Sequence, residues 1–274
     1  MLISPIQIEQ KAPANRTQNN NMTAKHSLYI QIIILALIST LISGCSVRLQ
    51  NYKEIVTELF NTPEDVTLSQ QEIEEFPYAG SYIQVDERPR AFMALAFDDN
   101  GVLKWRTGGE EIIHTKHGRI TATNNMSGAI AHTSNLKNDP LACFREAIRR
   151  NNQDLTNCPT TWQRDIWVTT ATPNKIEDQA YTYTSEFSVG ATEQVNLANG
   201  TTHQVIKIEE RISTSTSDNN VATNTFYIST DNARIVKSHQ LIAPPSSSQS
   251  SSESTFATIE EVKPYTLEEV KNNG

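Results

Sequence analysis

The stretch Ala91-Phe92-Met93-Ala94-Leu95-Ala96-Phe97-Asp98-Asp99-Asn100-Gly101-Val102-Leu103-Lys104-Trp105 decides the fold. Residues 91–97 are apolar without interruption, which predicts a central strand that is covered on both faces. Residues 98–101 then reverse the chain, because Asn-Gly adopts positive φ angles at low cost. Residues 102–105 return as a neighbouring antiparallel strand.

The rest of the chain continues in segments rich in Thr, Val, Ile and Tyr, which are typical of β-strands. Turn residues separate these segments, and no alternation of strands with helices predicts a parallel nucleotide-binding sheet. We therefore expect a mainly β fold, an antiparallel meander sheet curled as a half-barrel or sandwich, with short N-terminal helices and an interior filled by side chains. The expected strands are 81–86, 91–97, 102–105, 111–115, 119–123, 162–170, 180–189, 193–197, 204–214, 221–230, 234–242 and 255–262, with a weakly structured connection at 124–140.

The chain also divides into regions of different character. Because Met22 is an alternative start, the polar residues before it read as an N-terminal extension. We expect residues 1–44 to be an extension and lipoprotein signal peptide, and residues 45–77 to be a lipid-anchored helical preface with helices near 47–61 and after Ser69. Residues 78–263 are expected to form an antiparallel β domain, with an inserted helix near 141–150 and a Ser-rich loop at 244–254. Residues 264–274 are expected to be a polar tail.

The signal peptide is indicated by a basic residue, Lys25, before an apolar core at 28–41. The core ends in Ile42-Ser43-Gly44-Cys45, which has the form of a lipobox with small residues before the cleavage site. The alternative is a membrane span, but the core is shorter than the roughly 20 residues that a spanning helix needs. We therefore expect Cys45 to carry acyl chains such as palmitate. Ser46, in place of Asp, favours the outer membrane with the domain facing the periplasm.

Charge and cysteine content narrow the classes of partner. The formal net charge is −8, which argues against nucleic acid as a partner and against direct electrostatic capture of anionic lipid or acidic polysaccharide. It does not exclude a local basic groove. Cys143 and Cys158 form an even pair in an oxidising compartment, which predicts a disulfide. Two unpaired thiols are the alternative.

No motif in the sequence predicts catalysis, a cofactor or a metal. His114 and His117 have a His-x-x-His spacing, but His117 falls in a turn, and Glu111 and His114 project to opposite faces of a strand. The adjacent carboxylates at 98–99 and 110–111 do not have the separation of a glycosidase pair and suit turns instead. No Gly-x-Ser-x-Gly elbow and no glycine-rich phosphate loop occur in the sequence.

Tryptophan side chains are the candidate ligand contacts, because an indole ring can stack on a sugar. Trp105, Trp162 and Trp167 are the three tryptophans of the chain. Strand alternation puts Trp162 on the same face as apolar residues and Trp167 on the other. We therefore expect Trp162 in the core and Trp167 as a possible ligand contact.

Six short motifs occur in the order Phe76-Pro77-Tyr78-Ala79, residues 91–97, Asn100-Gly101-Val102-Leu103-Lys104-Trp105, Thr115-Lys116-His117-Gly118-Arg119-Ile120, Trp162-Gln163-Arg164 and Asn224-Thr225-Phe226-Tyr227-Ile228. These motifs resemble the YjbF/GfcB family of lipoproteins, which are encoded with exopolysaccharide and group 4 capsule export genes. The resemblance covers roughly residues 65–241; Cys143 to Cys158 and the Ser-rich loop depart from its pattern. It implies an outer-membrane lipoprotein with a curled antiparallel sheet and a role in secreting or assembling extracellular polysaccharide, and it transfers no catalytic residues.

Three functions are compatible with these observations. The first is a non-enzymatic module, tethered to outer-membrane lipid through acylated Cys45, whose β surface binds a polysaccharide export protein or the glycan. The second is an enzyme that modifies the polysaccharide, which requires convergent acids and raised carboxyl pKa values in a cleft. The third is a carrier of an acyl or polyprenyl chain, which requires a continuous apolar cavity.

Overall fold

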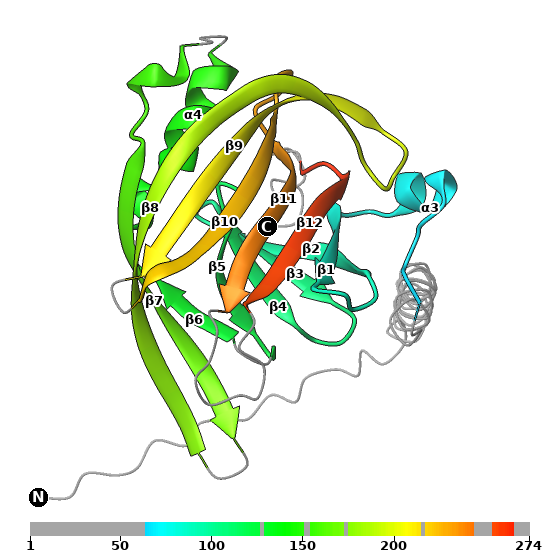
Figure 1. The fold of residues 1–274 in the computed structure, drawn as a ribbon. Coiled ribbons are helices and arrows are strands. Elements are labelled where there is room, and N and C mark those ends of the chain that lie inside the picture. Colours follow the sequence, from blue (N-terminus) through cyan, green and yellow to red (C-terminus); the bar gives the residue numbers. More distant parts are fainter. Residues whose placement is uncertain are drawn as a thin grey trace, which may run out of the picture. The chain divides into compact units, whose positions relative to one another are not determined.

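A single antiparallel sheet of twelve strands dominates the computed structural model (Figure 1). The structure describes residues 64–126, 129–150, 154–172, 175–214, 217–243 and 254–265, all within one compact unit. The expected mainly β fold is confirmed. The lipobox with Cys45, the expected helix at 47–61, most of the Ser-rich loop and most of the polar tail lie outside the described residues.

The strand order in the sheet is β5-β4-β3-β2-β1-β12-β11-β10-β9-β8-β7-β6, so each strand pairs with a sequence neighbour except where β1 pairs with β12. In the part of the chain that the structure describes, two α-helices and two short 3-10 helices accompany the sheet. The elements are α3 (Gln70–Glu75), β1 (Gly80–Val85), β2 (Ala91–Asp99), β3 (Val102–Thr107), β4 (Ile112–Lys116), β5 (Arg119–Asn124), β6 (Ala129–Thr133), η1 (Leu136–Asn138), α4 (Pro140–Arg149), η2 (Leu155–Asn157), β7 (Thr161–Thr172), β8 (Lys175–Asn196), β9 (Thr202–Thr214), β10 (Ser217–Ser229), β11 (Ile235–Ala243) and β12 (Thr255–Lys263).

The sheet curls until its two edge strands, β5 and β6, lie side by side (Figure 1). The backbone N–H of Ile130 in β6 donates to Thr123 Oγ1 in β5 at 3.1 Å. Thr133 Oγ1 of β6 donates to the carbonyl oxygen of Thr121 in β5 at 2.8 Å. The sheet is therefore nearly closed, and it has an inner and an outer face.

The β2–β3 hairpin forms as its sequence predicts. Asn100 and Gly101 adopt φ angles of 53° and 81°, which the turn requires. Phe92 and Met93 are buried on opposite faces of β2. Phe97 is 68% exposed, so the expectation that both faces are covered is wrong for the second half of this strand. The segment that covers the outer face of β2 near Phe92 does not extend as far as Phe97.

The outer face of β2 is covered by the segment of chain that leads into β1. Ser69 caps α3 through a capping box with Glu72, as the sequence predicts. Val66, Leu68 and Ile73 pack with residues of β1, β2 and β12 into one hydrophobic cluster. The segment thus covers the outer face of the sheet where β1 and β2 begin.

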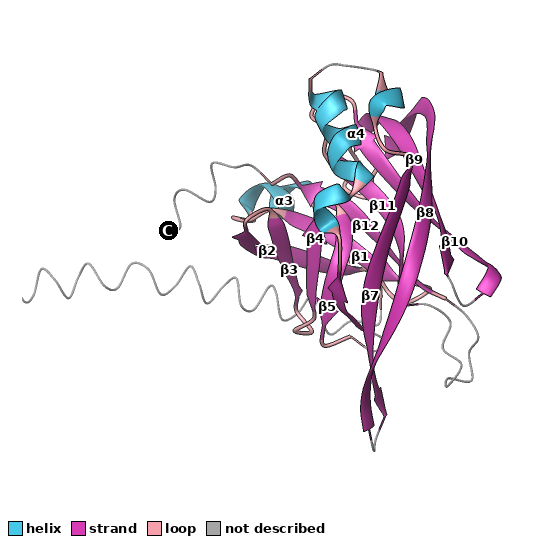
Figure 2. Cartoon of the chain, turned by 90° about the vertical axis from the view of Figure 1, so that its left-hand side faces the viewer, coloured by secondary structure: helices cyan, strands magenta, loops and turns pink. Residues whose placement is uncertain are grey.

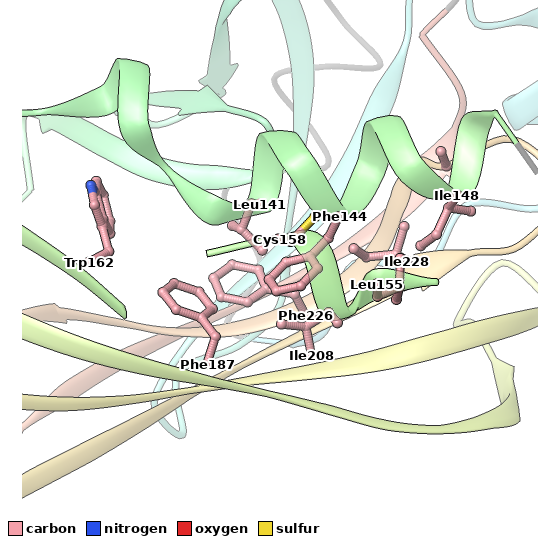
Figure 3. Packing of buried hydrophobic residues seen from close by; sticks show 11 residues of the cluster. Leu141, Phe144, Ile148, Leu155, Cys158, Trp162, Phe187, Ile208, Phe226 and Ile228 are labelled. Carbon is pink, nitrogen blue, oxygen red and sulfur yellow. The ribbon is translucent and has the colours of Figure 1, made fainter. Parts of the chain in front are cut away.

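Helix α4 lies over the inner side of the sheet at one end (Figure 2). Leu141, Phe144 and Ile148 are buried from this helix, and Ala147 packs beside them, as the helical periodicity predicts. They pack against strand residues that include Phe187 and Phe226 (Figure 3). Burial of three large apolar side chains contributes several kcal/mol, at about 1.5–3 kcal/mol each.

A disulfide connects α4 to the segment that enters β7. Cys143 and Cys158 are joined with an S–S length of 2.00 Å and a Cα–Cα distance of 5.6 Å. Because Cys143 lies in the middle of the helix, the bond holds α4 against the start of β7.

Two features of the topology differ from the expectation. The region expected as a weakly structured connection contains β6, which pairs with β7. The two strands expected at 180–189 and 193–197 are parts of one strand, β8, which starts at Lys175 and has a register shift between Val189 and Thr192. A bulge adds residues without ending the strand, so a break in the apolar pattern there did not mark a turn.

Gly118 provides a test of this packing. Its φ angle is 84°, and a Cβ atom there would lie 2.5 Å from Ile235 Cδ1 and 2.8 Å from Ile235 Cβ. Gly101 has φ 81° with nothing within 4 Å of such an atom, so it is a matched control for backbone strain. Gly101→Ala should lower the free energy of unfolding by about 1–2 kcal/mol. Gly118→Ala should lower it by about 1–3 kcal/mol more, because of overpacking. Equal losses in urea unfolding would contradict this account.

Candidate functional site

A pocket of about 420 Å³ opens on the inner side of the curled sheet, among β1, β3, β4, β11 and β12. In-register pairing of Ser81 with Glu261 and of Leu103 with Thr115 puts these lining residues on one face of the sheet. The β4–β5 turn contributes Gly118, and the β10–β11 turn and α4 contribute further residues. The interior is therefore not filled by side chains throughout, in contrast to the sequence-based expectation.

Four charged residues line the pocket: Arg145, Arg234, Glu261 and Lys263. Arg234 binds Glu261 in a bidentate ion pair, with nitrogen–oxygen distances of 2.8 and 2.9 Å. Lys263 Nζ donates to the carbonyl oxygens of Glu74 and Phe76 at 3.1 and 2.5 Å. Within the described part of the lining, the only carboxylate is thus bound to one of the three cations.

Two aromatic side chains and several hydroxyl groups also line the pocket, together with Leu103, Ile235 and Ile259. Trp105 Nε1 donates to Thr115 Oγ1 at 2.9 Å, which fixes the indole ring. Tyr265 donates from its hydroxyl to Asp98 Oδ2 at 2.7 Å. Ser81 and Ser238 add hydroxyl groups. The pocket therefore combines flat apolar rings with hydrogen-bonding groups.

A buried ionic network lies beside the pocket on the same inner face. Arg119 of β5 binds Asp139 through Nε and Nη2, at 2.6 and 3.2 Å, and binds Glu210 through Nη1 at 2.6 Å. Arg164 of β7 binds the other oxygen of Glu210 at 2.6 Å. The exposed fraction of these four side chains is 5% or less. The network is balanced, with two guanidinium groups and two carboxylates.

Neutral side chains satisfy the remaining lone pairs of Glu210. Ser185 Oγ donates to Glu210 Oε1 at 2.6 Å, and Asn224 Nδ2 donates to Oε2 at 2.8 Å. The aromatic ring of Trp162 lies 4.6 Å from the guanidinium carbon of Arg119 and 4.4 Å from that of Arg164. The network thereby connects α4, whose N-cap is Asp139, to five strands of the sheet, β5, β7, β8, β9 and β10.

The pKa values in the network reflect opposed effects of burial and pairing. Burial alone would raise the pKa of Glu210, but the charges of Arg119 and Arg164 outweigh it and lower the pKa to about 2. Burial would lower the pKa of Arg119, but Asp139 and Glu210 outweigh it and raise the pKa. Glu210 and Arg119 are therefore both charged at neutral pH.

Gln240 joins the network to the pocket. Its Oε1 accepts from the backbone N–H of Ile120 at 2.9 Å, next to Arg119. Its Nε2 donates at 2.8 Å to the carbonyl oxygen of Gly118 and at 2.8 Å to Ser238 Oγ, both from the pocket lining. The wall of the pocket is therefore fixed by hydrogen bonds from the buried interior.

Of the three tryptophans that the sequence offers as candidate ligand contacts, Trp105 lines this pocket, and Trp162 and Trp167 do not. Trp162 is buried as expected, and it contacts the ionic network. Trp167 is partly buried beside His132, with ring centroids 5.3 Å apart, and is absent from the pocket lining. Ligand contact by Trp167 stays a prediction. Cys143 and Cys158 lie beyond the pocket, in the attachment of α4.

The histidines and carboxylates of the hairpins have structural surroundings. Burial lowers the pKa of His117, and the charge of Arg145 adds to this effect. Burial also lowers the pKa of His114, together with the charge of Lys104. Asp99 pairs with Lys104 at 3.0 Å. No group of three or more His, Cys, Asp or Glu residues with metal-binding geometry occurs within the described part of the chain.

Sequence reasoning missed Arg145, Arg234 and Lys263. Each is a basic residue in a helix or at a strand end, and such residues usually contact solvent. The weak signal was the position of Arg145, four residues after Leu141 and three before Ile148, which puts it on the face of α4 that the sequence assigns to the core.

In the described residues, no helix combines the length and the apolar character needed to cross a membrane.

Comparison with known proteins assigns the family. The family model described as group 4 capsule polysaccharide lipoprotein gfcB, YjbF matches residues 52–248. The uncharacterised lipoprotein YjbF of Escherichia coli (strain K12) is 34% identical over 108 residues, which are 39% of this chain and 50% of that protein. This match therefore spans about half the length of that relative.

A second relative and a solved structure extend over more of the chain. The uncharacterised lipoprotein GfcB of Escherichia coli (strain K12) is 23% identical over 214 residues, which are 77% of this chain and 91% of that protein. The crystal structure of the hypothetical lipoprotein YmcC from Escherichia coli (K12) aligns with a TM-score of 0.59 and 22% identity, covering 77% of this chain and 94% of that chain. This structural similarity supports the antiparallel β fold of the chain. Because the family model spans more than half of the sequence, the chain belongs to the YjbF/GfcB family of capsule polysaccharide-associated lipoproteins.

Proposed function

We propose that this protein is an outer-membrane lipoprotein, anchored by acylated Cys45 on the periplasmic face, that assists the secretion or assembly of extracellular polysaccharide without catalysing a reaction. The curled sheet binds glycan in its inner pocket. The observation that carries this proposal is the combination of Trp105 and Tyr265 with hydroxyl and charged groups in a pocket of about 420 Å³. Sugars present both apolar ring faces and hydroxyl groups, so such a lining suits them.

The charges in the interior favour binding over catalysis. A polysaccharide-modifying enzyme needs a general acid whose pKa is raised by its surroundings. Among the described residues, the carboxyl groups with displaced pKa values, such as Glu210 and Glu146, are all displaced downward, by neighbouring cations or hydrogen bonds. The carboxylate in the pocket lining, Glu261, is bound by Arg234.

The pocket lining also favours glycan over a lipid chain. An acyl or polyprenyl chain would require an apolar tunnel, because an unpaired charge beside it would be desolvated at a cost of several kcal/mol. Arg145, Arg234, Glu261 and Lys263 all line the pocket. The neighbouring interior is occupied by the buried Arg119–Glu210 network.

Complementation in cells tests the proposed function. Deletion of the gene should reduce surface polysaccharide, and the wild-type gene should restore it. A Cys45→Ala gene should fail to restore it, because the domain would lose its membrane anchor. Ser46→Ala, at the next position, is the matched control and should restore the wild-type level. Surface polysaccharide is measured by extraction and quantification of sugar.

Two outcomes would contradict the proposal. Unchanged polysaccharide in the deletion strain would remove the role in secretion or assembly. Full restoration by Cys45→Ala, with the protein recovered in the soluble periplasmic fraction, would remove the need for the anchor.

A further inference from the structure

The charge of the pocket is opposite to the charge of the whole chain. The formal net charge of the protein is −8. Among the described residues, the pocket lining holds Arg145, Arg234 and Lys263 against the single carboxylate of Glu261. Two unit charges therefore remain uncompensated by the lining itself. A local excess of one sign in a concave site attracts ligands of the other sign.

Arg145 is the cation that best fits an external ligand. Its Nε donates to the carbonyl oxygen of Ala233 at 2.8 Å. No ion pair joins it to a carboxylate of the described residues, whereas Arg149, on the same helix, binds Glu146 at 2.5 Å. Burial lowers the pKa of Arg145, and the charges of Arg149 and Arg234 lower it further. The Nη atoms thus belong to a half-buried guanidinium in a positive environment.

The position of Arg145 is fixed before any ligand binds. Its neighbour Phe144 is fully buried in the core beneath α4, and Cys143 is held by the disulfide. The N-cap residue Asp139 is bound by Arg119. Preorganisation of this kind reduces the loss of conformational entropy when a ligand binds, and so reduces the entropic cost of binding. A partly desolvated guanidinium forms strong bidentate bonds with planar oxyanions.

We propose that the pocket binds an acidic unit of a glycan, with the anionic group of that unit bound to Arg145 and the sugar ring beside Trp105 and Tyr265. This inference rests on the proposed function, because it specifies the class of sugar. The anionic group is a carboxylate or a phosphate, which share the oxygen geometry that a guanidinium recognises. A pocket of about 420 Å³ lies within the range of small-molecule sites and suits one or two sugar units.

Binding to a trimer of galacturonic acid tests this inference, with its methyl-esterified, uncharged form as the matched ligand. Isothermal titration calorimetry with the folded, non-acylated domain should show binding of the acid and at least about tenfold weaker binding of the ester. Arg145→Met keeps an unbranched apolar side chain and should also weaken binding of the acid at least about tenfold. Arg145→Lys should restore part of the affinity. Arg149→Gln should leave it unchanged, because Arg149 is 68% exposed and outside the pocket.

A urea unfolding curve for each variant separates a binding defect from a folding defect. Equal binding of the acid and the ester would overturn the preference for an anion while leaving glycan binding in place. Absence of binding of both trimers at millimolar concentration, or equal affinity of Arg145→Met and wild type, would overturn the inference; the complementation assay decides the proposed function separately. Inorganic phosphate that competes with the acid trimer in wild type but not in Arg145→Met would support Arg145 as the anion site.

Discussion

Glu210→Gln is expected to lower the free energy of unfolding by about 3–5 kcal/mol at pH 7, because it leaves Arg119 and Arg164 without their shared anion inside the protein. Both arginines bind Glu210 at 2.6 Å, and the Glu210 side chain has no exposed surface. The measurement is urea unfolding followed by circular dichroism.

The adjacent residue provides a control for this substitution. Glu209 pairs with Lys207 at 2.6 Å on the same strand, and its side chain is 44% exposed. Glu209→Gln should cost less than about 1 kcal/mol, since surface ion pairs contribute little. If both substitutions had equal effects, the buried network would not hold the sheet together.

The same network predicts a dependence on pH. The pKa of Glu210 is lowered from 4.5 to about 2 in the folded protein. Its contribution to stability is therefore complete above pH 4.5 and is lost as the pH falls through about 2. The stability difference between wild type and Glu210→Gln should narrow over this interval. A constant difference between pH 5 and pH 2.5 would contradict the assignment.

Removal of the disulfide is the second large perturbation that we expect. The double variant Cys143→Ser, Cys158→Ser should lose about 3 kcal/mol of unfolding free energy, because a bond across 15 residues limits the unfolded chain. Reduced wild-type protein should match the variant in urea unfolding. The variant should also bind the acidic trimer more weakly, because α4 carries Arg145.

A specific result would contradict this second prediction. If wild-type protein under reducing conditions were as stable as the oxidised form, the packing of Leu141 and Phe144 would hold α4 without help from the bond. Peptide mapping under non-reducing conditions verifies that Cys143 and Cys158 are joined before the comparison is made.

The meander of strands could be predicted because its signals are local. Asn100-Gly101 and the turn at His117-Gly118 adopt the positive φ angles that their residue types favour. The capping box at Ser69 and the apolar face of α4 are likewise short-range patterns. Such features depend on residues within four positions of one another, so a single sequence contains them.

Strand β6 could not be predicted because pairing defines it. Its five residues, Ala129–Thr133, follow a polar connection and carry a weak alternation. They become a strand because β7 pairs with them and β5 lies alongside. Strand β8 was wrongly expected as two strands, because the bulge near Gly190 interrupts the alternation of apolar and polar residues. The pairing with β9 continues on both sides of this bulge, so the strand does not end there.

The buried charges were beyond prediction for a related reason. Arg119 and Glu210 are 91 residues apart, and each occupies a strand on which polar residues usually face solvent. Glu209 and Glu210 are identical in type, so nothing local indicates which carboxylate turns inward. Only closure of the sheet makes the inner position a place where opposite charges meet.

The approach of β5 to β6 has a consequence for the behaviour of this protein in a crowded compartment. An open sheet of this length would have two margins on which foreign strands could assemble, as in amyloid growth. Hydrogen bonds from Ile130 and Thr133 instead occupy acceptors of β5. Each copy of the protein is thereby protected from edge-to-edge aggregation with other copies.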